Sequence, residues 1–489
     1  MNSFNTQHSL AALGAPFSLP CTPTPVSAPQ WLAFNAELAT QLRLPKQYWH
    51  SDDGLAVFSG NIVPDWASPL AHAYAGHQFG HFVPQLGDGR ALLLAEVINA
   101  DNQLFDIQLK GAGQTPFSRR GDGRSPLGPV LREYLVSEAM YALGVPTTRA
   151  LAAVLTGDFV QRETAEPGAI LTRVASSHIR IGSFQYLAAR GDHGQLKTFA
   201  DYVINRHYPA CASEANPYLA LLAAVVAAQA KLVARWMSLG FIHGVMNTDN
   251  MSIAGETIDY GPCAFMDSFN PAQVYSFIDT QGRYAWGNQP RIASWNLARF
   301  AETLLPLLTE QPEQAVELAT EVLQSFNGQN ETEFLRLMAA KIGIVTATDT
   351  DEVLIRDLLN LMSANHADFS QSFRLLSRSV SDTAAGAAAL FADKQGWSDW
   401  AAKWQQRLAT QGIDPLQVSQ QMDNTNPALI ARNHLVAAAI TQATEQADLT
   451  LFNRLHKALA TPYTLSDDNA DFALPPQPQQ LIKNTFCGT

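Results

Sequence analysis

Residues 104–110, LFDIQLK, and residues 127–145, LGPVLREYLVSEAMYALGV, decide how the first half of this chain folds. The first stretch alternates apolar and polar residues, which is the two-residue period of a β-strand. The second stretch repeats its apolar residues at the spacing of an α-helix and so places five of them on one face, namely Leu127, Val130, Leu131, Tyr134 and Leu135. The sequence therefore predicts a strand that ends at Lys110 and a helix that carries Glu133.

The surrounding sequence extends this pattern into a sheet and then into helices. Apolar runs within residues 86–98, 148–157 and 168–176 predict further strands beside the first one. A long apolar helix is predicted over 217–239, and helical periodicity dominates from about 290 to 460. A strand-rich first half followed by helices predicts an α+β protein with two lobes and a site between them.

Four segments follow from this division. Residues 1–60 are rich in proline, serine and small residues, which predicts an irregular extension that wraps a domain. Residues 61–178 are expected to form a small, β-rich N lobe with one embedded helix, and residues 179–400 a larger, mainly helical C lobe. Residues 401–489 are expected to form a helical region and a cysteine-containing tail.

Composition narrows the class of protein. The net charge of -12 over 489 residues argues against broad binding of nucleic acids, which needs a basic surface. The first thirty residues have neither the basic start nor the apolar core of a secretory signal, and the four cysteines are widely spaced. The apolar run 218–228 is too short to span a bilayer and predicts a buried helix. We therefore expect a cytoplasmic protein without a membrane partner.

The order of four residues indicates chemistry on ATP. Lys110 at the end of a strand precedes Glu133 on a helix, which is the order of the lysine and glutamate that form an ion pair in protein kinases. Asn250 and Asp259 follow, and Asp259 begins the triplet DYG, one aromatic substitution from the kinase triplet DFG. Amide and carboxylate oxygens suit Mg²⁺, with Mn²⁺ as the alternative ion. The pattern predicts a protein-kinase-like fold.

The departures from a kinase are as informative as the matches. The position of the kinase base, five residues before Asn250, is Val245, and the nearest substitute carboxylate is Asp249. A GxGxxG loop is absent before the lysine, and two other loops supply small and charged residues instead, namely Gly87, Gly89, Arg90, Asp122 and Gly123. Arg173 and Arg180 add cations for a triphosphate bound in another direction.

Long runs then carry a resemblance to one family. Residues 74–91, 108–135, 176–186 and 243–267 resemble the selenoprotein O family of protein adenylyltransferases, and the terminal CGT extends the similarity to the end of the chain. The resemblance implies a pseudokinase that binds ATP flipped relative to ordinary kinases. It implies transfer of AMP to serine, threonine or tyrosine hydroxyls of proteins, with release of pyrophosphate.

The resemblance also implies a role for each residue. Asp249 would be the base, Asn250 and Asp259 would hold the metal, and Glu133 would be the structural partner of Lys110. The ATP contacts would be Gly87, Gly89, Arg90, Lys110, Asp122, Gly123, Arg173, Arg180 and Asp259. The family places selenocysteine or cysteine near the C-terminus, so a reversible disulfide between Cys263 and Cys487 is a hypothesis.

Three alternatives stay open at this stage. An ordinary protein kinase is motivated by Lys110, Glu133 and Asp259, although Val245 stands where its base belongs. A catalytically silent ATP-binding scaffold is motivated by the same missing base. Transfer of UMP is a variant of the leading prediction, because no residue that reads the nucleobase can be identified. The sequence does not disclose the oligomeric state or the protein substrates.

Overall fold

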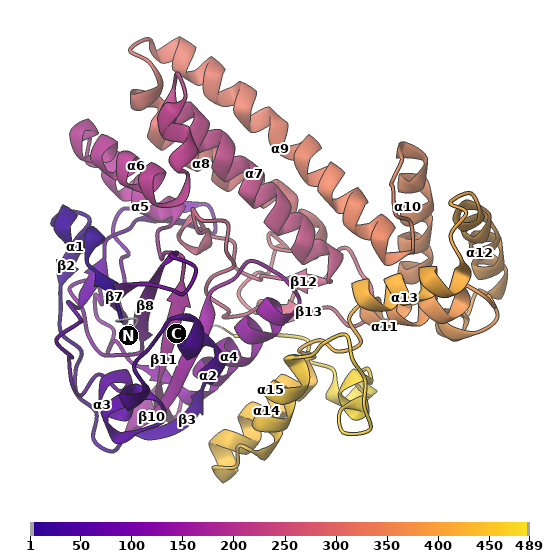
Figure 1. The fold of residues 1–489 in the computed structure, drawn as a ribbon, viewed down its shortest axis with the longest axis horizontal. Helices are drawn as coiled ribbons and strands as arrows, with labels where there is room; N and C mark the ends of the chain where they lie inside the picture. The colour runs from indigo at the N-terminus through magenta and orange to yellow at the C-terminus, as the bar shows by residue number, and fades with distance from the viewer. Residues whose placement is uncertain (1–3, 487–489) are drawn as a thin grey trace.

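The computed structural model describes residues 4–486, and a nine-stranded antiparallel sheet forms the core of its N-terminal part (Figure 1). The strand order is β2-β4-β7-β8-β11-β10-β3, with β1 paired to β7 and β9 paired to β11. The strands are β1 Thr6–Gln7, β2 Ser18–Pro20, β3 Gln30–Phe34, β4 Leu70–His72, β7 Ala91–Ile98, β8 Leu104–Lys110, β9 Ser125–Pro126, β10 Arg149–Gln161 and β11 Ala165–Ala175. Two short pairs lie outside this sheet, β5 Gly76–Gln78 with β6 His81–Val83 and β12 Phe241–Ile242 with β13 Ala264–Phe265.

The four strands predicted from periodicity are confirmed as β7, β8, β10 and β11, and their register positions the site. In the antiparallel pair of β8 and β11, Lys110 lies opposite Leu171 and Gln108 lies opposite Arg173. Side chains alternate between the two faces of a strand, so Lys110, Gln108 and Arg173 share one face. The register thus brings two cations from distant parts of the sequence together.

The first sixty residues are more regular than predicted. They contribute β1, β2 and β3 to the sheet, and three short helices, α1 Ser9–Leu13, α2 Ala36–Gln41 and α3 Asp52–Phe58, lie between and after these strands. The expectation of irregular chain was wrong for these elements because each is too short to show a period of its own. Pairing with strands far along the sequence stabilises them instead.

Helix α4, Leu127–Ala142, is the predicted helix, and it is covered on two sides. One side packs on β10 and β11, and the other packs on α14 and α15, where the ring of Tyr134 lies 5.2 Å from that of His456. Polar residues of α4 are therefore buried too. Glu138, for example, accepts hydrogen bonds of 2.9 and 2.8 Å from the Arg149 guanidinium.

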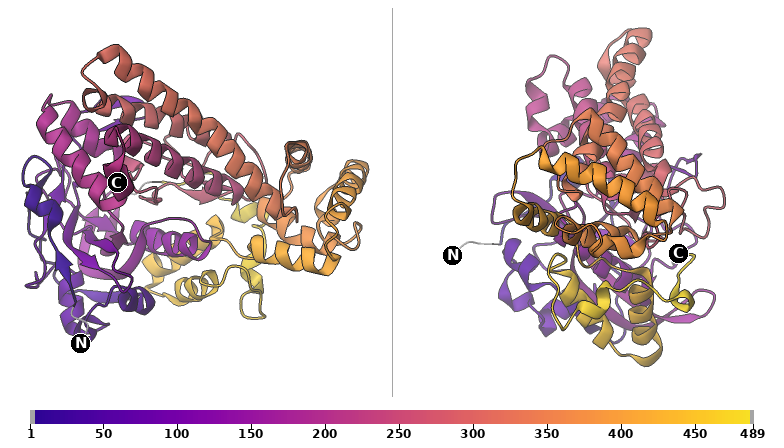
Figure 2. Two further views of the ribbon diagram at one scale, coloured as in Figure 1. Left: turned by 45° about the horizontal axis from the view of Figure 1, so that its top comes forward. Right: turned by 90° about the vertical axis from the view of Figure 1, so that its right-hand side faces the viewer.

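The second half is mainly helical, as predicted. Helices α7, α8 and α9 pack together, and α10 to α13 form a group at the far end from the sheet (Figures 1 and 2). The helices are α5 Ile181–Ala188, α6 His193–His207, α7 Pro217–Ser238, α8 Gln289–Leu308, α9 Pro312–Lys341, α10 Asp349–Ala364, α11 Phe369–Leu376, α12 Lys394–Ala409, α13 Pro415–Thr425, α14 Asn433–Gln446 and α15 Thr450–Leu459.

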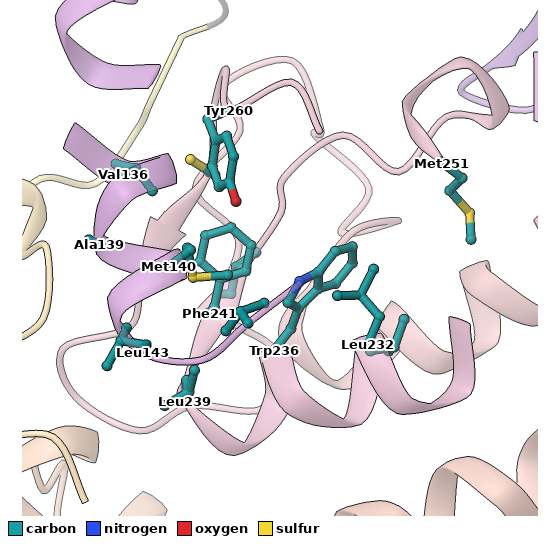
Figure 3. Packing of buried hydrophobic residues seen from close by; sticks show 14 of the residues in the cluster. Val136, Ala139, Met140, Leu143, Leu232, Trp236, Leu239, Phe241, Met251 and Tyr260 are labelled. Atoms are coloured by element: carbon teal, nitrogen blue, oxygen red, sulfur yellow. The ribbon is translucent and has the colours of Figure 1, made fainter. Parts of the chain in front are cut away.

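Helix α7 meets by length and composition the requirement for crossing a membrane, and it is the one helix in residues 4–486 that does so. Half of its most apolar window is buried against neighbouring elements. Figure 3 shows its C-terminal end, where Trp236 lies close to Phe241, and Met140 of α4 lies on the other side of Phe241. Tyr260 joins the same cluster, so the core connects α4 to the DYG segment.

Candidate functional site

A cleft of ≈ 560 Å³ gathers residues from the sheet, α4 and the loops on either side of Asp259. Every site residue predicted from the sequence, apart from the two cysteines, lines this cleft. They are Gly87, Gly89, Arg90, Lys110, Asp122, Gly123, Glu133, Arg173, Arg180, Asp249, Asn250 and Asp259. Val245, at the position of the kinase base, lines it as well.

Three cations converge on the carboxylate of Asp259. Lys110 Nζ lies 2.9 Å and Arg173 Nη1 2.6 Å from Oδ1, and Arg180 Nη1 lies 2.8 Å from Oδ2. Glu133 is the second acceptor, at 2.6 Å from Lys110 Nζ and 3.3 Å from Arg173 Nη1. The predicted contact between Lys110 and Glu133 is therefore present in the structure.

The state of Asp259 follows from these neighbours. Burial alone raises the pKa of the carboxyl, but Lys110, Arg173 and Arg180 outweigh it and hold the pKa well below its usual range. The backbone of Asp259 is left-handed, with φ of +64°, a conformation that aspartate adopts more readily than most other residues with a side chain. This turn aims the carboxylate at the three cations.

Two buried side chains that were not predicted from the sequence contact the guanidiniums of Arg173 and Arg180. Gln108 Oε1 accepts from Arg173 Nη2 at 2.7 Å, and Gln108 Nε2 donates to Asp88 Oδ2 at 2.9 Å. Asp88 Oδ1 lies 3.8 Å from Arg180 Nη2. Asp88 stands between Gly87 and Gly89, so the loop that those glycines marked was the available signal for it.

Asp249 is buried beside the cluster but makes few contacts. Its Oδ2 accepts from Gln78 Nε2 at 3.4 Å, and its Oδ1 has no hydrogen-bond partner among residues 4–486. Burial raises the pKa of this carboxyl to about 6, although Arg180 opposes the shift. A carboxylate with such a pKa that lines a cleft is suited to accept a proton near neutral pH.

The β5–β6 hairpin fixes the loop that carries Asp249. The backbone N–H of His77 donates to Thr248 Oγ1 at 2.7 Å, and that of Phe79 donates to Asn247 Oδ1 at 3.0 Å. Thr248 Oγ1 in turn donates to Gln185 Oε1 at 2.6 Å. The strands of the hairpin pair with each other, but their contacts with the Asp249 loop have no local signal, because Asn247 and Thr248 lie far along the chain.

The two loops predicted to contact ATP form one wall of the cleft. Gly87, at φ of +68°, lies against the Phe117 ring, so closely that a Cβ there would lie 2.2 Å from Phe117 Cγ. Gly123, at φ of +69°, packs against the Gly113 carbonyl in the same way, at 2.0 Å. Asp122 differs from its neighbours, because its carboxylate pairs with Arg162 at 2.8 and 3.2 Å. Nucleotide contact by Asp122 therefore stays a prediction.

The lining of the cleft carries an excess of positive charge although the chain is acidic overall. Its acidic members are Asp88, Asp122, Glu133, Asp249 and Asp259. Its cationic members are more numerous, namely Arg90, Lys110, Arg119, Arg124, Arg132, Arg162, Arg173 and Arg180. Such a cleft favours a polyanionic ligand such as a triphosphate.

Asn250 and Asp259 offer hard oxygen ligands in the same cleft. Asn250 Nδ2 donates to the Val245 carbonyl at 3.0 Å, which fixes the amide and leaves its oxygen as an acceptor. Among residues 4–486 no group of three or more His, Cys, Asp or Glu side chains forms a ready metal site. In proteins Mg²⁺ commonly takes one or two protein oxygens and completes its shell with water and phosphate.

The predicted cysteine pair is described only in part. Cys263 is buried, its carbonyl accepts from Arg132 Nη2, and burial raises the pKa of its thiol to about 11. Cys487 lies outside the described residues. The last described part of the tail reaches the same region, because Thr485 Oγ1 donates to the Pro262 carbonyl at 2.5 Å.

Comparison with known proteins assigns this chain to a family. Residues 1–460 match the family described as protein adenylyltransferase SelO. The chain belongs to the SelO family of protein adenylyltransferases. It is 55% identical over 487 residues to the protein nucleotidyltransferase YdiU of Bradyrhizobium diazoefficiens, covering 99% of both chains.

Two further relatives agree with this assignment. The protein nucleotidyltransferase YdiU of Rhizobium meliloti is 53% identical over 491 residues, covering both chains completely. That of Agrobacterium fabrum is 52% identical over 482 residues, covering 99% of each chain. The resemblance predicted from the sequence is confirmed, and this SelO-family chain is an enzyme that transfers a nucleotide to protein.

Gly76 provides a test of the position of Asp249. A Cβ at Gly76 would lie 2.5 Å from Asp249 Oδ1, so Gly76→Ala must displace either the carboxylate or the hairpin. We expect nucleotide transfer by this SelO-family enzyme to fall about 100-fold, because a shift near 1 Å suffices for such a loss. ATP affinity, measured by calorimetry, should stay unchanged because the cations are untouched.

Gly328→Ala is the matched control. Gly328 lies in α9 and has no atom near its Cβ position, so alanine there should leave transfer unchanged and raise helix stability by up to about 1 kcal/mol. Full transfer activity in Gly76→Ala would show that Asp249 does not need its present position.

Proposed function

We propose that this enzyme binds ATP with its triphosphate in the cation cluster and transfers AMP to serine, threonine or tyrosine hydroxyls of other proteins. The observation that carries the proposal is the convergence of Lys110, Arg173 and Arg180 on one carboxylate beside the buried Asp249. Pyrophosphate leaves, and the α-phosphate faces the acceptor. This direction of ATP is flipped relative to an ordinary kinase.

The proposed architecture is that of a two-lobed protein kinase. The proposed N lobe, residues 61–178, contains α4 and the sheet strands from β4 to β11, and the proposed C lobe, residues 179–400, begins with α5. The contact between Lys110 and Glu133 supports this reading, because the same pair orients the phosphate-binding lysine in kinases. In this proposal residues 1–60 and 401–489 extend the two lobes, and the enzyme works in the cytoplasm.

The proton and charge movements follow from the geometry. The Asp249 carboxylate, which lines the cleft, takes the proton of the acceptor hydroxyl as the hydroxyl oxygen attacks the α-phosphorus. The bond from the α-phosphorus to the bridging oxygen breaks, and the negative charge passes to pyrophosphate. Lys110, Arg173 and Arg180 stabilise that charge because they are already oriented and little water separates them from it.

The oxygens of Asn250 and Asp259 suit a metal ion in the cleft. Asn250 and Asp259 would hold Mg²⁺ or Mn²⁺, which would supply further neutralisation of the phosphate charge. Asp259 would then exchange part of its ion pairing with Lys110, Arg173 and Arg180 for a bond to the metal. Gly87, Gly89, Arg90, Asp122 and Gly123 would hold the rest of the nucleotide, whether the transferred group is AMP or, as a variant of the same reaction, UMP.

Two other functions are set against this proposal. An ordinary kinase is favoured by the contact of Lys110 with Glu133, but the position of its base is a buried valine, Val245. A silent scaffold is disfavoured by Asp249, because a buried carboxylate with an unpartnered oxygen is typical of a group that exchanges protons.

Labelled ATP distinguishes the three functions. With Mg²⁺ and a protein acceptor, we expect label from the α-phosphate to appear on protein together with free pyrophosphate, and we expect Asp259→Asn to abolish both. Label from the γ-phosphate on protein would favour the kinase instead. Absence of both labels under all metal conditions would favour the scaffold.

The pH dependence tests Asp249 as the base. The raised pKa of about 6 means that the carboxyl becomes protonated below that pH, so kcat/KM should fall about tenfold per pH unit on the acidic side. The hydrogen bond from Gln78 lowers this pKa. Gln78→Leu should therefore shift the acidic fall of kcat/KM to higher pH. A profile that is flat between about pH 5 and 7 would exclude Asp249 as the base.

The disulfide between Cys263 and Cys487 remains a proposal. Thr485 contacts Pro262, the residue before Cys263, which supports an approach of the tail to this thiol. Forming the bond removes two electrons and two protons from the thiols, and a disulfide such as oxidised glutathione accepts them. After oxidation and proteolysis we expect two peptides, one with Cys263 and one with Cys487, joined by a disulfide. Mass mapping that finds both thiols free would contradict the proposal.

A further inference from the structure

Residues 275–278 form an apolar edge at the cleft. Phe277 is 57% exposed and Ile278 is 55% exposed, and Ile278 lines the same cleft as Asp249. Aromatic and large aliphatic residues exposed beside a catalytic cleft are typical of surfaces that bind other proteins. The edge is therefore placed where a protein acceptor has to approach.

The chain already binds a segment of itself at this edge. Ser276 forms a parallel β-bridge with Thr485 near the C-terminus. The Thr485 N–H donates to the Tyr275 carbonyl at 2.7 Å, and the Phe277 N–H donates to the Thr485 carbonyl at 3.0 Å. The backbone of 275–277 is thus able to accept an added strand, which is a common way of binding extended peptides.

The bound segment shows which side chains fit. Thr485 is 5% exposed and turns its hydroxyl inward to the Pro262 carbonyl. The next residue, Phe486, is 64% exposed, and its ring lies 5.1 Å from that of Phe277. The edge therefore takes a small hydroxyl residue facing inward, followed by an aromatic residue facing outward.

The self-contact is small enough to be displaced. Among residues 4–486 it consists of two backbone hydrogen bonds, one hydroxyl hydrogen bond and one ring pair that is more than half exposed. Each such hydrogen bond contributes only about 1 kcal/mol against water. A competing segment that makes the same contacts, together with others in the cleft, binds in preference to it.

We propose that the edge of residues 275–278 binds an extended segment of the acceptor protein in parallel register, and that residues 485–486 occupy this edge when no acceptor is bound. The recognised chemistry is a serine or threonine followed by an aromatic residue, used for docking. The inference rests on the proposed transfer to protein hydroxyls. It adds the surface by which the acceptor is selected.

A labelled peptide tests the binding edge without relying on activity. The probe is a fluorescent peptide of residues 476–486, PQPQQLIKNTF, added under reducing conditions to the full chain carrying Thr485→Pro and Phe486→Ala. These changes remove the donor to Tyr275 and the ring that packs on Phe277, and so free the edge. We expect the peptide to bind this variant at least about tenfold more tightly than the unchanged chain, where the tail competes.

Two further variants locate the binding. Adding Phe277→Ala to the freed chain should weaken the peptide about tenfold, because the aromatic contact is lost. Adding Phe159→Ala, which removes a 73% exposed ring on β10, should change nothing. The proposal would be overturned if the peptide bound the freed and the unchanged chain equally well. It would also be overturned if Phe277→Ala left the affinity of the freed chain for the peptide unchanged.

Competition then tests the acceptor itself. With alkylated casein as an extended, hydroxyl-rich acceptor, the peptide should inhibit transfer of AMP to casein by the freed chain competitively with casein and leave ATP affinity unchanged. Unimpaired transfer at a saturating peptide concentration would overturn the proposal, because the edge would then serve the tail alone. Failure of every form to release pyrophosphate from ATP, with peptide binding intact, would instead mark failure of the proposed function.

Discussion

The shared carboxylate of Asp259 is the interaction on which the site depends. Lys110, Arg173 and Arg180 come from two strands and from the start of a helix, and like charges held this close repel one another unless an anion lies between them. Asp259 supplies that anion in the structure, and Glu133 supplies a second one to Lys110 and Arg173. In the proposed function a triphosphate takes over this role with more charge, so one cluster would serve both binding and leaving-group stabilisation.

Helix α4 makes this arrangement rigid. It carries Glu133, and it also carries Arg132, whose guanidinium donates to the carbonyls of Gly261, the last residue of the DYG triplet, and of Cys263 two residues later. The same helix packs against Tyr260 and the end of α7 (Figure 3). One helix thus holds Glu133, the partner of the strand lysine, and the segment that carries Asp259 in a fixed relation.

The elements with a local period were predictable, and those stabilised by distant partners were not. The strand ending at Lys110 and the helix carrying Glu133 follow from apolar spacing, and the order of Asn250 and Asp259 pointed to the cleft. The β5–β6 hairpin has no such signal, because its backbone donors find their acceptors in Asn247 and Thr248, about 170 residues later. The order of residues in the sequence likewise suggested that Asp259 binds a metal ion. It did not reveal that Asp259 forms ion pairs with Lys110, Arg173 and Arg180.

The cover of α4 by α14 and α15 bears on how the enzyme is made. A ribosome delivers the sheet, α4 and the DYG segment long before the helices that bury the outer face of α4 and the ring of Tyr134. Until α15 has emerged, that apolar face stays in water and the helix that carries Glu133 lacks half of its packing. A nascent chain therefore holds an unfinished candidate site, and the cell receives a complete transferase only when synthesis is nearly finished.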